Sequence, residues 1–444
     1  MHRSKSRTIL STLYTRNHAL LFSFHASAAA FITYFCMYAF RKPFSTGIYE
    51  GYTLWNMDYK ILLIIAQVLG YMTSKFIGIR VVSAMNPGNR GKYIILFILL
   101  AEFSLFLFAV APFPYGIIFL FLNGLPLGMI WGIVFSYLEG RKVTEILAAG
   151  LSASFILSSG AVKATGKWII LNLSVPEVWM PFVTGLIYLP PLLIGIWMLN
   201  KIPPPDPDEK RMRSERVPMS RADRKKLFID LGGSLFFLII VYCYLTAYRD
   251  FRDNFASDMW LELGYADSSN IFTLTEIPVA LCVLIALGAL CKIKNNWHAF
   301  LANYFLITAG ILLIWISSLL MKLNPISPVV WSILTGIGVY LAYVPFGSML
   351  FERMIAILRY RSNAGFLIYI ADSAGYLGSI AVLLLKNFFA VNISAYNFIV
   401  RFAVIAGILP VVILVISGIL FKRKMNKLAV RSSIQAGHRR TDHS

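Results

Sequence analysis

Apolar runs of about 20 residues alternate with short polar segments along the whole chain, and a run of that length crosses a bilayer as one α-helix. We therefore predict an all-α membrane protein whose twelve transmembrane helices form two pseudo-symmetric six-helix bundles. The first six segments are 18–40, 60–79, 93–112, 115–138, 146–170 and 178–200, and the second six are 228–250, 270–290, 299–321, 328–351, 364–386 and 401–421.

One long polar segment separates the two sets. It contains Pro203–Pro205 and a dense mixture of charges, which is typical of an exposed linker. The predicted divisions are a cytoplasmic N-terminal segment 1–17, a first bundle 18–200, a linker 201–227, a second bundle 228–421 and a basic tail 422–444.

The basic residues are distributed unevenly between the two predicted sides of the membrane. Of the 41 Lys and Arg residues, 30 lie on the side that holds both termini and the linker, and 9 lie on the opposite side. The positive-inside rule then places both termini in the cytoplasm. We expect the protein to lie in the cell (inner) membrane. We interpret the net charge of +20 as this orientation signal, together with contacts between basic residues and anionic lipids. We therefore predict no nucleic-acid partner.

The composition excludes a soluble enzyme, because the chain is 58% hydrophobic and only 14% charged, with a mean hydropathy of +0.69. The sequence contains no HExxH, Walker A or GxSxG motif. We therefore predict no enzymatic activity, no cofactor and no metal site, and the energy for any transport must come from gradients or exchange.

Two apolar runs end in the same way at positions 208 residues apart. Tyr34, Tyr38 and Arg41 share one helix face in the first run, and Tyr242 and Arg249 share one in the second. An arginine in a membrane segment is costly, and two at matching points predict a duplicated transporter with one substrate-binding guanidinium in each half. The alternative is that both arginines reach outward to lipid headgroups.

Other ionisable residues also fall inside or at the ends of the apolar segments. Lys75 and Arg252 are further candidates for substrate binding, and Lys75 is equally a candidate brace for the cytoplasmic gate. A buried carboxylate either pairs with a cation or takes up a proton. The candidates for proton coupling or gating are therefore Glu102, Glu276, Asp372 and the cation Lys163, and structural ion pairs are the alternative.

Several patches resemble the major facilitator superfamily, and within it the organophosphate:phosphate antiporter branch. They are Tyr38–Lys42, Gly70–Gly78, Asn123–Gly132, Tyr248–Arg249, Glu276–Pro278, and Ala364–Phe366 with Gly375–Gly378. The resemblance implies the two-bundle major facilitator fold. It also implies exchange of an organophosphate for phosphate, with Arg249 at the position of the family's seventh-helix arginine.

We therefore expect a monomeric secondary transporter that binds a small anion by alternating access within the lipid bilayer. Exchange is expected because a site that holds two arginines and no anion resists closure. One alternative is a proton-coupled carrier or efflux protein for another small solute. An alternative of another class is a membrane receptor or assembly factor that does not transport.

Overall fold

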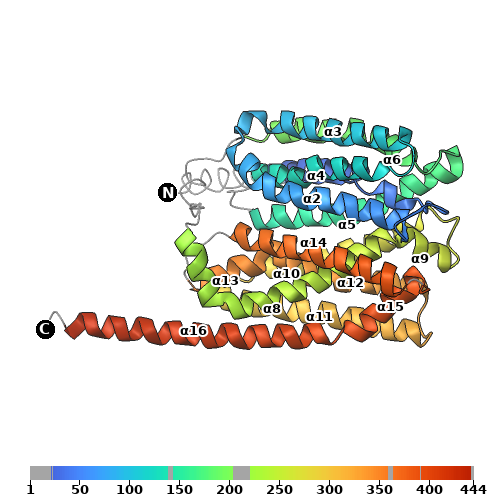
Figure 1. The fold of residues 1–444 in the computed structure, drawn as a ribbon. Coiled ribbons are helices and arrows are strands. Elements are labelled where there is room, and N and C mark those ends of the chain that lie inside the picture. The colour runs from blue at the N-terminus through green and yellow to red at the C-terminus, as the bar shows by residue number, and fades with distance from the viewer. Residues whose placement is uncertain are drawn as a thin grey trace, which may run out of the picture. The chain divides into compact units, whose positions relative to one another are not determined.

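The computed structural model describes residue 22 and residues 24–138, 144–203, 221–358, 364–390 and 392–441, and these ranges are mostly helical (Figure 1). The helices are the first apolar helix Phe24–Phe40, α2 Tyr59–Ala84, α3 Arg90–Val110, α4 Gly116–Leu138, α5 Thr144–Leu173, α6 Met180–Asn200, α8 Arg221–Asn254, α9 Ala256–Glu262, α10 Ile271–Cys291, α11 Asn296–Lys322, α12 Pro328–Pro345, α13 Phe351–Leu358, α14 Ala364–Phe389, α15 Ala395–Ala406 and α16 Leu409–Thr441. Single turns lie at η1 Tyr38–Phe40, η2 Pro43–Thr46, η3 Pro87–Asn89 and η4 Phe346–Leu350, and the strands β1 Thr53–Leu54 and β2 Met57–Asp58 pair antiparallel.

The helices of the described ranges fit a multi-pass membrane protein. Nine of them are long and apolar enough to cross a bilayer, and the bent pair Ala395–Ala406 and Leu409–Lys427 makes a tenth span. The shorter first helix and α5 complete twelve segments in the predicted order. The predicted all-α membrane fold is therefore confirmed.

Two predicted segments are less regular than their apolar pattern suggested. The tenth continues past Pro345 through the π-turn η4 into α13, because proline cannot supply the backbone N–H of a regular helix. The twelfth was predicted as one helix over 401–421, but the chain bends by 40° between α15 and α16. Pro410 stands in the first turn of α16, where its missing N–H costs little.

Contacts group the chain into two compact units. Unit 1 comprises Met1–Ser214 and Asn254–Cys291, and unit 2 comprises Glu215–Asp253 and Lys292–Ser444. This grouping differs from a division at the linker, because it includes α9 and α10 in unit 1. The N-terminal segment 1–17 and most of the linker lie outside the described residues, and the predicted bundle bounds stay a prediction.

Two lysines attach the start of the segment 254–291 to the rest of unit 1. Lys42 Nζ donates to Asn254 Oδ1 at 2.9 Å, and Lys60 Nζ lies 2.6 Å from Asp258 Oδ2. Both lysines are buried, with exposed fractions of 5% and 4%. A buried ammonium needs such acceptors, so these contacts help to hold α9 in unit 1.

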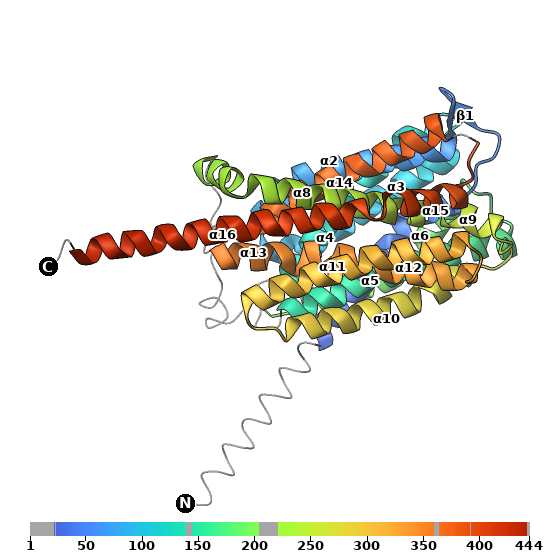
Figure 2. The same cartoon turned by 90° about the horizontal axis from the view of Figure 1, so that it is seen from below.

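Close helix contacts in each unit depend on glycine. In unit 1, a Cβ on Gly70 of α2 would lie 2.1 Å from the carbonyl oxygen of Phe121 in α4. In unit 2, a Cβ on Gly338 of α12 would lie 2.6 Å from the carbonyl oxygen of Gly310 in α11. Figure 2 shows α11 and α12 side by side along their length. Small residues permit this backbone approach, which is how helices pack in lipid without a hydrophobic driving force.

Candidate functional site

Two buried amides fix the end of the first helix and so position Arg41. The helix ends in a 3₁₀ turn in which the Arg41 N–H donates to the Tyr38 carbonyl at 3.0 Å. Asn123 of α4 donates from Nδ2 to the Phe40 carbonyl at 3.0 Å, and Gln67 of α2 donates from Nε2 to the Arg41 carbonyl at 2.9 Å. These donors satisfy carbonyls that a helix end leaves without intrahelical partners.

The Arg41 guanidinium lies against an aromatic ring. Its Cζ is 3.8 Å from the centroid of Tyr71 in α2, which is a cation–π distance. Lys75, one turn further along α2, places its Nζ 5.4 Å from the same ring and 5.5 Å from the ring of Trp131 in α4. Arg41 and Lys75 have exposed fractions of 7% and 8%. One phenol ring is therefore shared by two buried cations.

The two predicted tyrosines of the first helix lie beside this arginine. Tyr34 and Tyr38 meet edge to face with centroids 5.6 Å apart, and Tyr38 is 5.9 Å from the Arg41 Cζ. Tyr34 also interacts with Tyr71. We call the following residues the unit 1 cluster: Tyr34, Tyr38, Arg41, Tyr71, Lys75 and Trp131.

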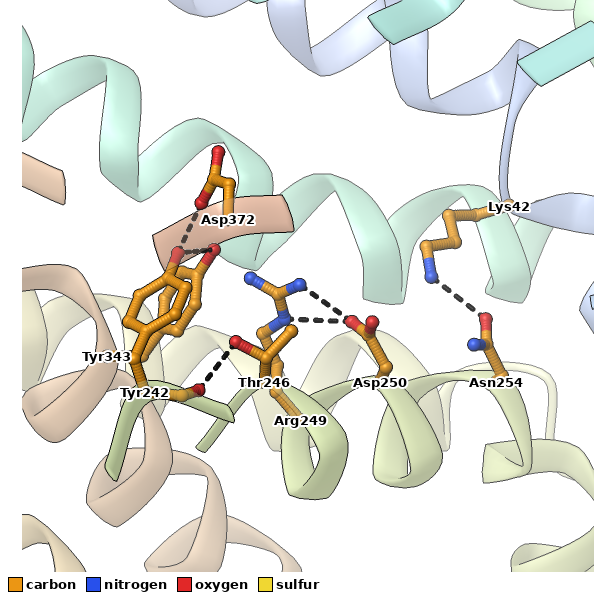
Figure 3. Close-up of polar contacts among 8 residues, drawn as sticks. All are labelled: Lys42, Tyr242, Thr246, Arg249, Asp250, Asn254, Tyr343 and Asp372. Atoms are coloured by element: carbon orange, nitrogen blue, oxygen red, sulfur yellow. Dashed lines mark hydrogen bonds and ion pairs between the residues drawn. The ribbon is translucent and has the colours of Figure 1, made fainter. Parts of the chain in front are cut away.

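Arg249 lies in unit 2, near the end of α8, and is paired with the next residue. Its Nε and Nη2 donate to Asp250 Oδ1 at 3.0 and 2.7 Å (Figure 3). Its Cζ lies 4.1 Å from the ring centroid of Tyr343 in α12. Asp250 Oδ2 is buried and has no hydrogen-bond partner among the described residues. The charge of this arginine is thus balanced by an adjacent carboxylate inside the same unit.

A second carboxyl group is connected to Arg249 through two phenols. Tyr242 of α8 donates a hydrogen bond to Asp372 Oδ1 of α14, and its oxygen lies 2.8 Å from the Tyr343 hydroxyl. The Tyr242 and Tyr343 rings stack with centroids 5.0 Å apart. Gly375 allows α14 to approach, because a Cβ there would lie 2.6 Å from Thr246 Oγ1. We call the following residues the unit 2 cluster: Tyr242, Arg249, Asp250, Tyr343, Asp372 and Tyr376.

Arg252, the third predicted arginine, has different contacts. Its Nη2 donates to the backbone carbonyl of Ser332 at 3.0 Å and lies 3.4 Å from the Ser332 hydroxyl. It therefore ties α8 to the first turns of α12 rather than joining Arg249 on Tyr343.

Lys163 and Glu276 project from the facing surfaces of α5 and α10 in unit 1. Gly160 of α5 lies against α10, since a Cβ there would be 2.4 Å from the Phe272 carbonyl oxygen and 2.9 Å from Glu276 Cγ. Lys163, three residues after Gly160, places its Nζ 6.0 Å from the Phe272 ring. The structure thus brings these two predicted gating residues to one helix contact.

Glu102 lies at a different contact, between α3 and α6. Its Oε2 would be 2.2 Å from a Cβ on Gly185, and it has an exposed fraction of 6%. Neither carboxyl oxygen has a hydrogen-bond partner among the described residues. The structure therefore does not bring Glu102 together with Lys75 or Lys163 through any described contact.

Sequence reasoning missed the rings on which both arginines lie. Tyr71 precedes Lys75 by four residues, so helical spacing alone puts it on the lysine's face. Tyr343 is about a hundred residues from Arg249, and no local pattern connects them. The structure also pairs Arg249 with Asp250, the residue that directly follows it.

The fold is similar to that of a solved transporter. The structure titled "Crystal structure of D-xylose-proton symporter" matches with a TM-score of 0.57 over 87% of this chain and 96% of that chain, at 12% sequence identity. The likeness shows the major facilitator type of fold, and it does not single out the organophosphate:phosphate antiporter branch. None of the curated proteins compared with the chain matches it.

A family model matches most of the sequence. It covers residues 43–424, which includes both clusters apart from the tyrosines and arginine at the end of the first helix. The chain belongs to the family described as "Family of unknown function (DUF5690)".

Proposed function

We propose that the protein is a secondary transporter of a small anion and that Arg41 of unit 1 and Arg249 of unit 2 are both anion-binding residues. The observation that carries this proposal is that each unit places one arginine with its guanidinium against a tyrosine ring, at 3.8 Å in unit 1 and 4.1 Å in unit 2. The similarity of the fold to that of a solved D-xylose-proton symporter supports it.

The chemistry of the unit 1 cluster suits an anion. A guanidinium that stacks through its face keeps in-plane N–H donors that match the paired oxygens of a phosphate or carboxylate. Lys75 adds a second positive charge, because its Nζ lies 5.4 Å from the centroid of the same Tyr71 ring. Two buried cations that share one ring repel each other, and an anion bound by both relieves that repulsion.

The chemistry of the unit 2 cluster changes the expectation of exchange. Arg249 is already balanced by Asp250, so the unit 2 cluster does not need an anion to offset the charge of this arginine. The electrostatic argument for obligatory exchange is therefore weaker than it would be for two arginines without carboxylate partners. Exchange of an organophosphate for phosphate remains the first version of the proposal to test.

Proton-coupled transport is the second candidate, and a specific observation favours it. In the unit 2 cluster, the hydroxyl groups of Tyr242 and Tyr343 connect the carboxyl group of Asp372 to the ring on which Arg249 lies. A carboxyl group in that position can take up a proton beside the arginine that is proposed to bind the anion.

A binding measurement tests the proposal. The purified protein is screened by thermal unfolding against inorganic phosphate, glycerol phosphate, simple carboxylates and neutral sugars. A ligand that binds only the folded state raises its unfolding temperature. We expect anions to raise that temperature and neutral sugars to leave it unchanged.

Conservative variants locate the binding. Arg41→Lys and Arg249→Lys keep the charge but lose the planar paired donors, so each should reduce the stabilisation by anions. Arg401→Lys is the matched control, because Arg401 is exposed on α15. Stabilisation by neutral sugars but by no anion, or equal stabilisation in all three variants, would refute the arginine site.

A further inference from the structure

The hydrogen bonds of the unit 2 cluster form a chain that ends on a carboxyl group. The Tyr242 hydroxyl is hydrogen bonded both to Asp372 and to the Tyr343 hydroxyl, and it has only one hydrogen to donate. When Asp372 is ionised it can only accept, so Tyr242 donates to Asp372 and Tyr343 donates to Tyr242. The direction of the whole chain therefore reports whether Asp372 carries a proton.

We propose that Asp372 binds the coupling proton of this transporter and that the proton and the anion are carried together. This proposal rests on the proposed function of anion transport. It adds the driving ion, the residue that carries it and the sense of the coupling, which is symport.

Protonation of Asp372 can reverse the hydrogen-bond chain. One proton adds to a carboxylate oxygen, and the new carboxylic O–H then donates to the Tyr242 oxygen. The Tyr242 O–H then turns to donate to the Tyr343 oxygen, so the Tyr343 O–H no longer donates to Tyr242. The only new covalent bond is the O–H of the protonated carboxyl group. The Tyr343 O–H can then donate to an anion at Arg249, whose Cζ lies 4.1 Å from the Tyr343 ring.

The change in charge also favours anion binding when Asp372 is protonated. Ionised Asp372 contributes a negative charge to the unit 2 cluster, and protonation removes that charge. The cluster should therefore attract an anion more strongly once Asp372 is protonated. Because linkage is reciprocal, a proton that favours the anion is itself held more tightly once the anion is bound.

Within unit 2, ionisable groups from three helices interact with Asp372 or Arg249. From α8 come Tyr242, Arg249 and Asp250, and from α12 comes Tyr343 (Figure 3). From α14 itself comes Tyr376, which interacts with Arg249. Asp372 is the carboxyl group that the hydroxyl groups of Tyr242 and Tyr343 connect to the ring on which Arg249 lies.

A spectroscopic test needs no bound anion. Infrared difference spectra of the purified protein between acidic and alkaline buffer should contain a carboxylic C=O band that is absent from Asp372→Asn. Asp267→Asn, at an exposed loop position, is the matched control and should keep the band. A wild-type spectrum whose carboxylic bands all persist in Asp372→Asn would overturn the proposal, whether or not the protein transports anions.

A transport test addresses the coupling. Vesicles with purified protein are given inorganic phosphate at one fixed external pH, so that its ionisation outside is constant, while the interior is made neutral or alkaline. An alkaline interior should drive phosphate accumulation by the wild type and by Asp267→Asn. Asp372→Asn should lose this accumulation, because an amide can neither gain nor lose the coupling proton.

The outcomes separate the two proposals. Accumulation by Asp372→Asn that still follows the pH gradient as in wild type contradicts the proton site and leaves anion transport standing. Phosphate uptake by neither protein, together with the Asp372 infrared band, contradicts phosphate transport and leaves the proton site standing. Tyr242→Phe keeps the carboxyl group but breaks the chain, so it should bind phosphate with a smaller dependence on pH. A dependence equal to that of wild type would contradict the relay.

Discussion

At the scale of single residues, the two stacked arginines differ in the charge beside them. Arg41 shares the Tyr71 ring with Lys75, so its neighbour adds positive charge. Arg249 is hydrogen bonded to Asp250, so its neighbour cancels it. We therefore expect the unit 2 cluster to attract an anion only weakly until it takes up a proton or Asp250 moves away from Arg249.

Tyr71→Leu should weaken anion binding because it removes the ring that holds both cations. A buried cation–π contact contributes about 0.5–2 kcal/mol, so we expect the affinity for inorganic phosphate to fall by about tenfold. Titration calorimetry measures it, and Tyr115→Leu, at a tyrosine that is 57% exposed, is the control. Unchanged affinity in Tyr71→Leu would show that the ring does not position the cations for an anion.

Asp250→Asn should destabilise the protein in the absence of anions. The change leaves the half-buried Arg249 without its charged partner, and loss of one member of such a pair costs about 3 kcal/mol. Inorganic phosphate should then raise the unfolding temperature more in the variant than in wild type, since the anion replaces the lost charge. An equal or smaller rise would mean that Arg249 is not open to the anion.

At the scale of the elements, glycines set how closely the helices approach. The α2–α4 contact at Gly70 and the α8–α14 contact at Gly375 both leave no room for a methyl group. The first brings Tyr71 and Lys75 beside Trp131, and the second brings Asp372 to Tyr242. Packing between helices thus decides which ionisable groups meet.

Gly70→Ala should destabilise unit 1, whereas Gly288→Ala should not. A Cβ on Gly70 would lie 2.1 Å from a backbone oxygen that cannot move aside, and such overpacking costs about 1–3 kcal/mol. Gly288 of α10 has nothing within 4 Å of its Cβ position, so alanine there should be neutral or slightly stabilising. Thermal unfolding in detergent compares the two, and equal stabilities would argue against the close α2–α4 contact.

The elements could be predicted from the sequence, and their contacts mostly could not. Length and hydropathy are local properties, so the spans were predicted in the right order, and the bend before Pro410 was the main error within the described residues. Arg41 and Arg249 were identifiable because they repeat at one spacing. The pairing of Tyr242 with Tyr343 and Asp372 depends on three helices far apart in the chain, which no sequence periodicity reports.

At the scale of the whole molecule, orientation in the membrane follows from the basic residues. The excess of 30 over 9 Lys and Arg predicts that both termini and the linker are cytoplasmic. A cysteine placed at Met219 in a variant without the four natural cysteines should resist membrane-impermeant maleimides in intact cells and react after lysis. Labelling in intact cells would contradict the predicted orientation.

Uptake of labelled inorganic phosphate and glycerol phosphate into vesicles with purified protein tests the central claim most directly. We predict uptake above that of protein-free vesicles, faster into vesicles loaded with phosphate or given an alkaline interior. Uptake should be impaired in both Arg41→Lys and Arg249→Lys but not in Arg401→Lys. Equal rates in wild-type, Arg41→Lys and Arg249→Lys vesicles, or no uptake above protein-free vesicles for either anion, would contradict anion transport through the two arginines.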